Sequence, residues 1–111
     1  MLLDFWASWC TACIVEFPQL REAYERFAKR GFEILGMNCD KPEDLQKARE
    51  IVLDRVAFWP QAMGPAPFEI AYKRLRIEQW PTKILLDRDG RFRKVFFGPT
   101  DLAELEKLLS P

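Results

Sequence analysis

The chain has 111 residues, of which 49% are apolar, 31% charged and 14% aromatic, and 17 basic residues balance 17 acidic ones. This length and composition predict one folded domain over residues 1–111 and exclude a disordered chain, while the zero net charge argues against an electrostatic nucleic-acid binder. The absence of histidine excludes histidine-based catalysis, and no apolar run approaches the ~20 residues that a transmembrane helix needs.

Hydrophobic periodicity divides the first part of the chain into strands and a helix. The apolar run at residues 2–6 is long enough for a buried strand. Apolar residues recur at spacings of three and four through residues 11–30, which predicts a helix with one buried stripe. Pro18 should kink this helix, and Gly31 is suited to its left-handed cap. Residues 32–38 then predict a second strand.

The second part of the chain predicts a helix, a loop, a hairpin and a closing helix. The helix starts near Asp40, and its expected apolar face comprises Leu45, Ala48, Val52, Leu53 and Val56. Residues 58–67 contain three prolines and a glycine and predict a loop, followed by one or two helical turns at residues 68–75. The remaining expected elements are a strand at 83–86, a turn through Asp89 and Gly90, a strand at 92–97, and a helix capped by Asp101 with Leu102, Leu105, Leu108 and Leu109 facing inward.

This order of elements predicts an α/β fold. Two parallel strands joined by a helix, then an antiparallel hairpin and a helix, should form a mixed four-stranded sheet with helices on both faces. Within residues 72–94, eight Lys or Arg outnumber three acids. We expect these charges, Lys83 among them, to lie on the solvated outer faces of the hairpin, and a docking strip for a partner is the alternative.

The most informative motif is the pair Cys10 and Cys13. Two cysteines three residues apart at the start of a helix share one face and lie within disulfide reach. Unpaired backbone N–H groups there favour a thiolate at Cys10, which is the nucleophile of disulfide exchange, and Cys13 can resolve the mixed disulfide. A zinc site is the alternative, but the chain offers only Cys39 and carboxylates as further ligands, so we expect no metal. Cys39 is expected to pack as a small hydrophobe.

The residues around this pair resemble a known family. The run Asp4-Phe5-Trp6-Ala7-Ser8-Trp9-Cys10 and the later Trp80-Pro81-Thr82 resemble the thioredoxin superfamily, which places W-C-x-x-C after the first core strand and a cis-proline opposite it. The TlpA/ResA-like branch is similar at Glu16-Phe17-Pro18, Trp59-Pro60-Gln61 and Leu86-Asp87-Arg88-Asp89-Gly90. The resemblance covers nearly the whole chain. It implies a thioredoxin-like thiol-disulfide oxidoreductase whose redox-active disulfide is Cys10–Cys13, with no other cofactor.

Two carboxylates are candidates for proton transfer. Asp4, in an otherwise apolar strand, should be buried with a raised pKa and could take the proton from Cys13, and the resemblance implies the same role. The alternative is a solvated acid at a strand end. Glu16 lies one turn after Cys13, and the resemblance implies that it shares this proton handling. Its alternative role is stabilisation of a helix first turn.

Three residues are candidates for substrate binding. Pro81, if its peptide bond is cis, would expose the backbone of Trp80 so that a substrate strand can pair beside the cysteines. Trp80 and Trp9 would shape this groove, and core packing is the alternative for Trp80. The expected partners are therefore protein disulfides or dithiols and an electron donor that re-reduces the pair.

The sequence also departs from the family's pattern. The hairpin that usually precedes the first core strand is absent, so the chain is either trimmed at its N-terminus or a minimal form of the fold. The dipeptide Thr11-Ala12 lacks the proline that helps to tune the redox potential in relatives. It also lacks the histidine of the strongly oxidising relatives, so the resemblance favours the reducing direction. By resemblance we expect a monomer outside the cytoplasm, periplasmic or membrane-tethered through a missing N-terminal segment, with a cytoplasmic location as the alternative.

The sequence leaves two other functions to consider beside the oxidoreductase. A peroxidase of this superfamily would use a lone cysteine in a Pro/Thr/Arg setting, which the sequence does not supply. A redox-silent thioredoxin-like module that binds proteins through its Trp-rich surface is the remaining alternative. Such a module would not need a depressed pKa at Cys10.

Overall fold

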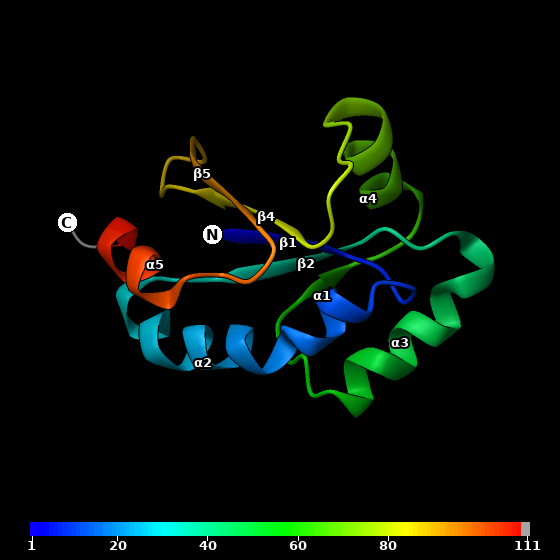
Figure 1. Ribbon diagram of the computed structural model, residues 1–111, viewed down its shortest axis with the longest axis horizontal. Helices are drawn as coiled ribbons and strands as arrows, with labels where there is room; N and C mark the ends of the chain where they lie inside the picture. Colours follow the sequence, from blue (N-terminus) through cyan, green and yellow to red (C-terminus); the bar gives the residue numbers. More distant parts are fainter. Residues whose placement is uncertain (110–111) are drawn as a thin grey trace.

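The computed structural model describes residues 1–109 as a mixed sheet packed between helices (Figure 1). The strands are β1 (Leu2–Trp6), β2 (Ile34–Asn38), β3 (Gln61–Ala62), β4 (Thr82–Leu86) and β5 (Phe92–Phe97). The helices are α1 (Thr11–Val15), α2 (Phe17–Phe27), α3 (Leu45–Asp54), α4 (Pro65–Glu69) and α5 (Leu102–Leu109), with short helical segments at Ala28–Arg30, Pro42–Asp44 and Ile70–Arg74. Residues 110 and 111 of the expected single domain lie outside the described residues.

The sheet has the mixed topology that the order of elements predicts. Its strands lie in the order β3-β2-β1-β4-β5. The β1–β2 and β2–β3 pairs are parallel, whereas the β1–β4 and β4–β5 pairs are antiparallel. The expected α/β class is therefore confirmed, and the expected number of strands, four, is one too low.

The additional strand, β3, lies inside the segment expected to be a loop. It is only two residues long, too short to show a hydrophobic period, and the surrounding prolines and glycine favour a loop. The backbone N–H of Gly36 donates to the Pro60 carbonyl at 2.8 Å, which starts the pairing with β2. The Gln61 side chain then lies over Gly36 and accepts a hydrogen bond from the indole nitrogen of Trp6 at 2.9 Å.

Replacing Gly36 with alanine should destabilise the protein. The added methyl group would occupy the space of the Gln61 carboxamide, so this side chain must move and the buried Trp6 indole loses its acceptor. We expect a loss of about 1–3 kcal/mol in the free energy of unfolding, measured by urea denaturation. The Gly90→Ala variant serves for comparison with Gly36→Ala. Gly90 lies in a turn with φ of 80°, and an added methyl group there would meet open space. A Gly36→Ala variant as stable as the wild type would contradict this packing.

The helix expected over residues 11–30 is interrupted next to Pro18, as this proline predicts. α1 ends at Val15 and α2 begins at Phe17, which leaves Glu16 at the junction and Pro18 in the first turn of α2. Proline is accommodated there because its missing N–H would have no partner inside the helix. The expected left-handed cap is also present, since Gly31 has φ of 84°.

The apolar face expected for the third helix is wrong at its C-terminal end. α3 ends at Asp54, and the side chains of Leu53 and Val56 are 80% and 54% exposed. Ala48, Ile51 and Val52 pack against the core instead. Because successive residues turn by about 100° around a helix, Leu53 lies beyond the stripe that these three residues form.

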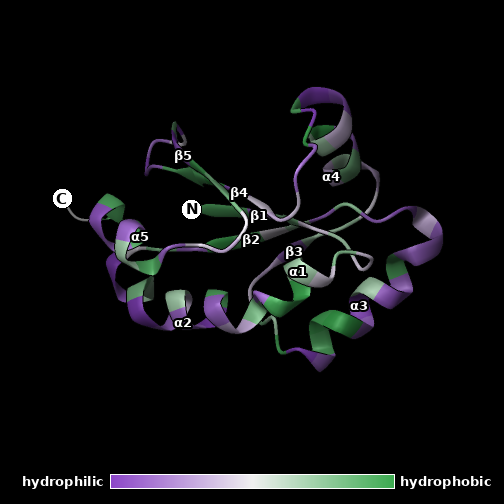
Figure 2. Cartoon of the chain, in the orientation of Figure 1, coloured by the Kyte–Doolittle hydropathy of each residue, from purple (hydrophilic) through white to green (hydrophobic). Residues whose placement is uncertain are grey.

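Helices cover both faces of the sheet, as expected. Side chains of β1, β2 and β4 alternate between two buried clusters, which lie on opposite faces of the sheet. Hydrophobic and hydrophilic stretches alternate along the helices α2 and α3 that cover one face (Figure 2). The larger cluster contains Leu2, Trp6 and Leu85 and packs against α1, α2, α3 and α5. The smaller contains Phe5 and packs against α4 and the segment after it. Within residues 1–109, no helix combines the length and apolar character required to cross a membrane.

Candidate active site

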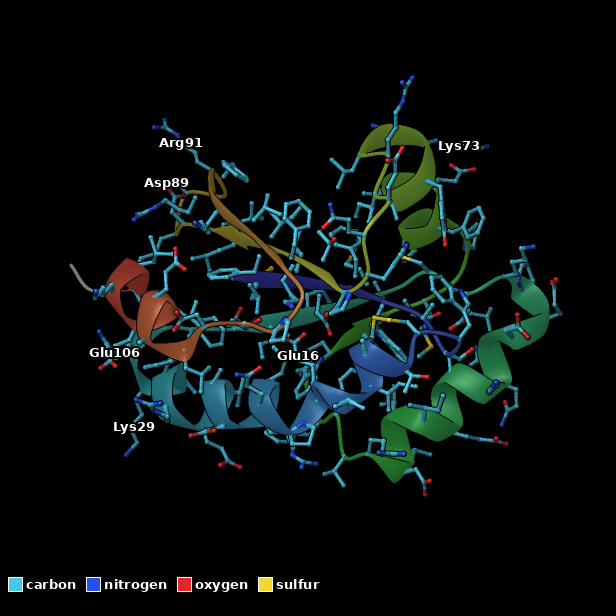
Figure 3. All side chains as sticks on the ribbon, viewed as in Figure 1. Glu16, Lys29, Lys73, Asp89, Arg91 and Glu106 are labelled. Atoms are coloured by element: carbon cyan, nitrogen blue, oxygen red, sulfur yellow. A yellow bond between two sulfur atoms is a disulfide. The ribbon has the colours of Figure 1, made fainter. Side chains whose placement is uncertain are left out.

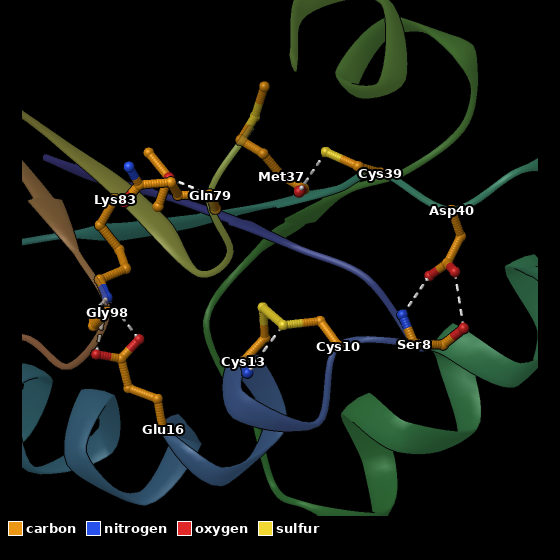
Figure 4. The surroundings of a disulfide bond; sticks show 11 residues. Ser8, Cys10, Cys13, Glu16, Met37, Cys39, Asp40, Gln79, Lys83 and Gly98 are labelled. Atoms are coloured by element: carbon orange, nitrogen blue, oxygen red, sulfur yellow. Dashed lines mark hydrogen bonds and ion pairs between the residues drawn. A yellow bond between two sulfur atoms is a disulfide. The ribbon is translucent and has the colours of Figure 1, made fainter. Parts of the chain in front are cut away.

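The Cys10–Cys13 pair lies at the N-terminus of α1 and forms a disulfide, with the two Cα atoms 5.3 Å apart (Figure 4). The two cysteines differ in burial, since Cys10 is 6% and Cys13 1% exposed. Cys10 is the N-cap residue, and the backbone N–H of Cys13 donates to its sulfur at 3.1 Å. A donor aimed at this sulfur would also stabilise a negative charge on it after reduction.

The loop before the disulfide is fastened to the end of β2 by Asp40. Its carboxylate accepts from the backbone N–H of Ser8 at 2.9 Å and from the Ser8 hydroxyl at 2.7 Å. The side-chain amide of Asn38 adds a third hydrogen bond at 2.7 Å. All three residues are buried, so the position of Cys10 relative to the sheet is fixed by a satisfied polar network.

The residues expected to bind substrate meet beside the disulfide. The Trp80–Pro81 peptide bond is cis, as predicted. Trp9 is 54% exposed, and its ring contacts that of Trp80 with centroids 5.2 Å apart. Trp80 also packs against both core clusters, as the alternative of core packing predicts. A largely apolar groove of about 310 Å³ runs past Pro81, lined by Ala12, Val15, Glu16, Gln19, Trp80, Pro81, Gly98 and Pro99.

Asp4 is buried without a hydrogen-bond partner. Its side chain is on the face of β1 that carries Leu2 and Trp6, which is the face covered by α1 and α2. Neither carboxylate oxygen has a hydrogen-bond partner. Burial raises the pKa of Asp4 to about 8; the charge of Glu16 raises it further and that of Lys83 lowers it. The expected burial and raised pKa are confirmed, and a solvated strand-end acid is excluded.

Glu16 points into the molecule, whereas Lys29, Lys73, Asp89 and Arg91 project from its outside (Figure 3). Its two carboxylate oxygens lie 2.8 and 2.9 Å from the ammonium nitrogen of Lys83. One oxygen also accepts from the backbone N–H and the hydroxyl of Thr100, at 2.7 and 2.9 Å. Glu16 is the N-cap residue of α2, but its side chain makes no capping hydrogen bond to that helix.

Lys83 is the main residue of this region that sequence reasoning missed. It was expected on a solvated face, but its side chain is 0% exposed. The sequence did contain a signal for its burial. Lys83 lies in a strand between two others, helices were expected on both sides of the sheet, and its position two residues before Leu85 places it on the same face as Asp4. No sequence signal marked Thr100, whose contact with Glu16 spans 84 residues.

The third cysteine stays outside the disulfide. Cys39 is 1% exposed, and its thiol donates to the Met37 carbonyl at 3.3 Å. Burial raises its pKa to about 12, with Asp40 and Asp4 adding to the effect, so the thiol remains neutral. Within the described residues, no three Cys, His, Asp or Glu side chains gather as a metal-ligand set.

These features define a class of protein: a thioredoxin-like domain in which a disulfide-bonded cysteine pair at a helix N-terminus accompanies a cis-proline. Comparison with family models agrees, because the AhpC/TSA family model matches residues 1–97. The chain belongs to the AhpC/TSA family of thioredoxin-like proteins.

Individual relatives are similar over almost the whole chain. A thiol-disulfide oxidoreductase ResA from Geobacillus thermodenitrificans is 29% identical over 117 aligned residues, covering 98% of this chain and 60% of that protein. Among solved structures, the thioredoxin domain of a thiol-disulfide oxidoreductase from Bacteroides vulgatus has a TM-score of 0.82 at 28% identity, covering 98% of this chain and 78% of that one. A putative thiol:disulfide interchange protein DsbE from Chlorobium tepidum has a TM-score of 0.81 at 26% identity, covering 97% and 75%. The chain thus spans about 60% of the length of the curated relative.

Proposed function

We propose that the protein is a thiol-disulfide oxidoreductase that reduces disulfides in protein substrates. The observation that carries this proposal is the asymmetry of the pair. Cys10 is the N-cap residue of α1 and keeps the larger exposed fraction, whereas Cys13 is buried one turn deeper. A substrate therefore reaches the Cys10 sulfur first, and Cys13 is placed to complete the exchange. The paired cysteines are the reason to propose exchange and not the peroxidase chemistry of a lone cysteine.

The reaction transfers two electrons in two steps. The Cys10 thiolate attacks one sulfur of a substrate disulfide, which forms a mixed disulfide and releases the other substrate sulfur as a thiolate that takes up a proton. Cys13 then gives its proton to a base and attacks the Cys10 sulfur. The Cys10–Cys13 bond forms, the mixed disulfide breaks, and the second substrate sulfur leaves and is protonated. An external dithiol donor must then return two electrons to the protein.

The groove beside Pro81 is the proposed binding surface for the substrate. An extended substrate segment could pair with the backbone at Trp80, while apolar side chains contact Trp9 and the walls of the groove. By resemblance to the TlpA/ResA-like branch, we place the protein outside the cytoplasm. Its partners there would be proteins with exposed disulfides and a membrane-side or soluble dithiol donor.

Reduction of insulin by the wild-type protein, with dithiothreitol as electron donor, tests this proposal. Alkylation of the reduced protein across pH should show Cys10 titrating below the ~8.5 of a free thiol. A redox-silent binding module would accelerate no insulin reduction and would show an ordinary thiol titration. Equilibration with glutathione then gives the reduction potential, and a potential below that of glutathione is the result expected for a reductase.

A further inference from the structure

Lys83 places a positive charge in the interior, next to the two carboxylates of the site. Its side chain is 0% exposed, and its strand β4 lies between β1 and β5. The ammonium nitrogen contacts both oxygens of Glu16 and donates to the Gly98 carbonyl. The ammonium group therefore donates two hydrogen bonds, to one Glu16 oxygen and to Gly98, and makes a charge contact with the other Glu16 oxygen.

The partners of Glu16 fit only its ionised form. Lys83 contributes an ammonium group, and Thr100 contributes a backbone N–H and a hydroxyl to the same carboxylate. A protonated carboxyl group would direct a hydrogen toward one of these donors or leave it without an acceptor. The carboxylate is therefore held in place as a counterion, joined to β4 and to the loop that precedes α5.

Asp4 has the opposite surroundings. It is the cross-strand partner of Lys83 in the β1–β4 pair, yet neither of its oxygens has a hydrogen-bond partner. The charged groups that act on it are Glu16 from the α1–α2 junction and Lys83 from β4. Cys39, at the end of β2, also interacts with Asp4, but its pKa of about 12 keeps it neutral. A buried carboxyl group without a donor favours the protonated form.

We propose that Lys83 is a positioning residue that holds Glu16 ionised as its counterion, so that Asp4 alone carries the exchangeable proton of the site. This inference rests on the proposed thiol exchange. In the resolving step, the Cys13 thiol would transfer its proton to the ionised form of Asp4, which a pKa of about 8 leaves as a minor fraction at neutral pH. At the same time the Cys13 sulfur bonds to the Cys10 sulfur and the substrate thiolate leaves. Glu16 and Lys83 would keep their charges throughout.

Opposite shifts of the Asp4 pKa in two variants test this arrangement. Lys83→Met removes a charge that lowers the Asp4 pKa, and Glu16→Gln removes a charge that raises it. In the oxidised protein, the carboxyl carbon signal of Asp4, followed by NMR across pH, should move its midpoint up by about one unit or more in Lys83→Met and down by a similar amount in Glu16→Gln. The double variant should return close to the wild-type midpoint.

The double variant, Lys83→Met with Glu16→Gln, also allows the proposal to be tested if one of the single variants does not fold. Removing one partner of a buried ion pair is costly, whereas replacing both by neutral groups is often tolerated. If Asp4 is the only base, the double variant should reduce insulin within about tenfold of the wild-type rate, since a lost general base costs about 10²–10⁴-fold. Lys94→Met removes an exposed partner of Glu104 on the same hairpin and should change neither the rate nor the Asp4 midpoint.

Two results would overturn the role of Lys83. One is an Asp4 midpoint that stays at the wild-type value in Lys83→Met or in Glu16→Gln. The other is a folded double variant whose rate of insulin reduction falls by the 10²–10⁴-fold expected for a lost general base. Such a fall would assign the exchangeable proton to Glu16. If the wild type does not reduce insulin while the two opposite NMR shifts are present, the proposed function fails and the electrostatic arrangement remains.

Discussion

Replacing Cys10 with serine should reduce insulin reduction to the uncatalysed background. The oxygen of serine is not a nucleophile at neutral pH, so no mixed disulfide with substrate can form. Replacing Cys13 with serine should instead leave the first attack intact and remove the resolving thiol. This variant should accumulate a covalent complex between Cys10 and the substrate, visible on a non-reducing gel and lost on reduction.

Cys39→Ala is the matched control for these cysteine variants, because Cys39 is buried and outside the disulfide. We expect it to reduce insulin at the wild-type rate and to trap no substrate. Equal activity of Cys10→Ser and Cys13→Ser would argue against the two-cysteine mechanism. Trapping through Cys13 in a Cys10→Ser background would reverse the roles assigned to the two cysteines.

Replacing Asp4 with asparagine should lower turnover by roughly ten- to a thousandfold, because the resolving cysteine loses its proton acceptor. The same change should stabilise the fold at neutral pH. The pKa of Asp4 is about 8 in the folded protein against an ordinary value of 3.8, so the folded state binds more protons than the unfolded state between these values. Its contribution to stability is therefore complete below about pH 4 and is lost as pH rises toward about 8.

The stability effect can be measured apart from catalysis. The free energies of unfolding of Asp4→Asn and of the wild type are compared with both proteins oxidised. Near pH 4, the ionisation of Asp4 should contribute little to the difference between them. The difference should grow with pH to a gain for the variant on the order of 5 kcal/mol at pH 8. A difference that does not change with pH would contradict the raised pKa of Asp4. If Asp4→Asn reduces insulin at the wild-type rate at every pH from about 5 to about 9, Asp4 has no part in the mechanism.

The redox pair and its surroundings were predictable because they depend on local sequence. The C-x-x-C spacing, the breaking effect of Pro18 and the alternation around Asp4 each operate within a few residues. The resemblance to thioredoxin-like proteins added the cis bond before Pro81, which chemistry alone would not have indicated. Most strands and helices were also predictable, since their hydrophobic periods span five residues or more.

The features that were missed depend on contacts between distant parts of the chain. β3 is held in the sheet by β2 and by the Trp6–Gln61 hydrogen bond, which joins residues 55 positions apart. Lys83 appeared as one basic residue among eight, and its burial follows only when both neighbouring strands and the covering helices are in place. Composition indicated a charged surface strip because it cannot distinguish a buried cation from a solvated one.

The anchoring of Glu16 sets an order on how the site can be completed during synthesis. The cysteines are translated before Lys83 and Thr100, the partners of Glu16, which follow Glu16 by 67 and 84 positions. A nascent chain that has emerged only as far as the cysteines therefore carries both sulfurs but lacks the partners that fix the adjacent carboxylate. A disulfide formed at that stage would precede the arrangement of charges around Glu16, which is complete only once Thr100 is available to fold.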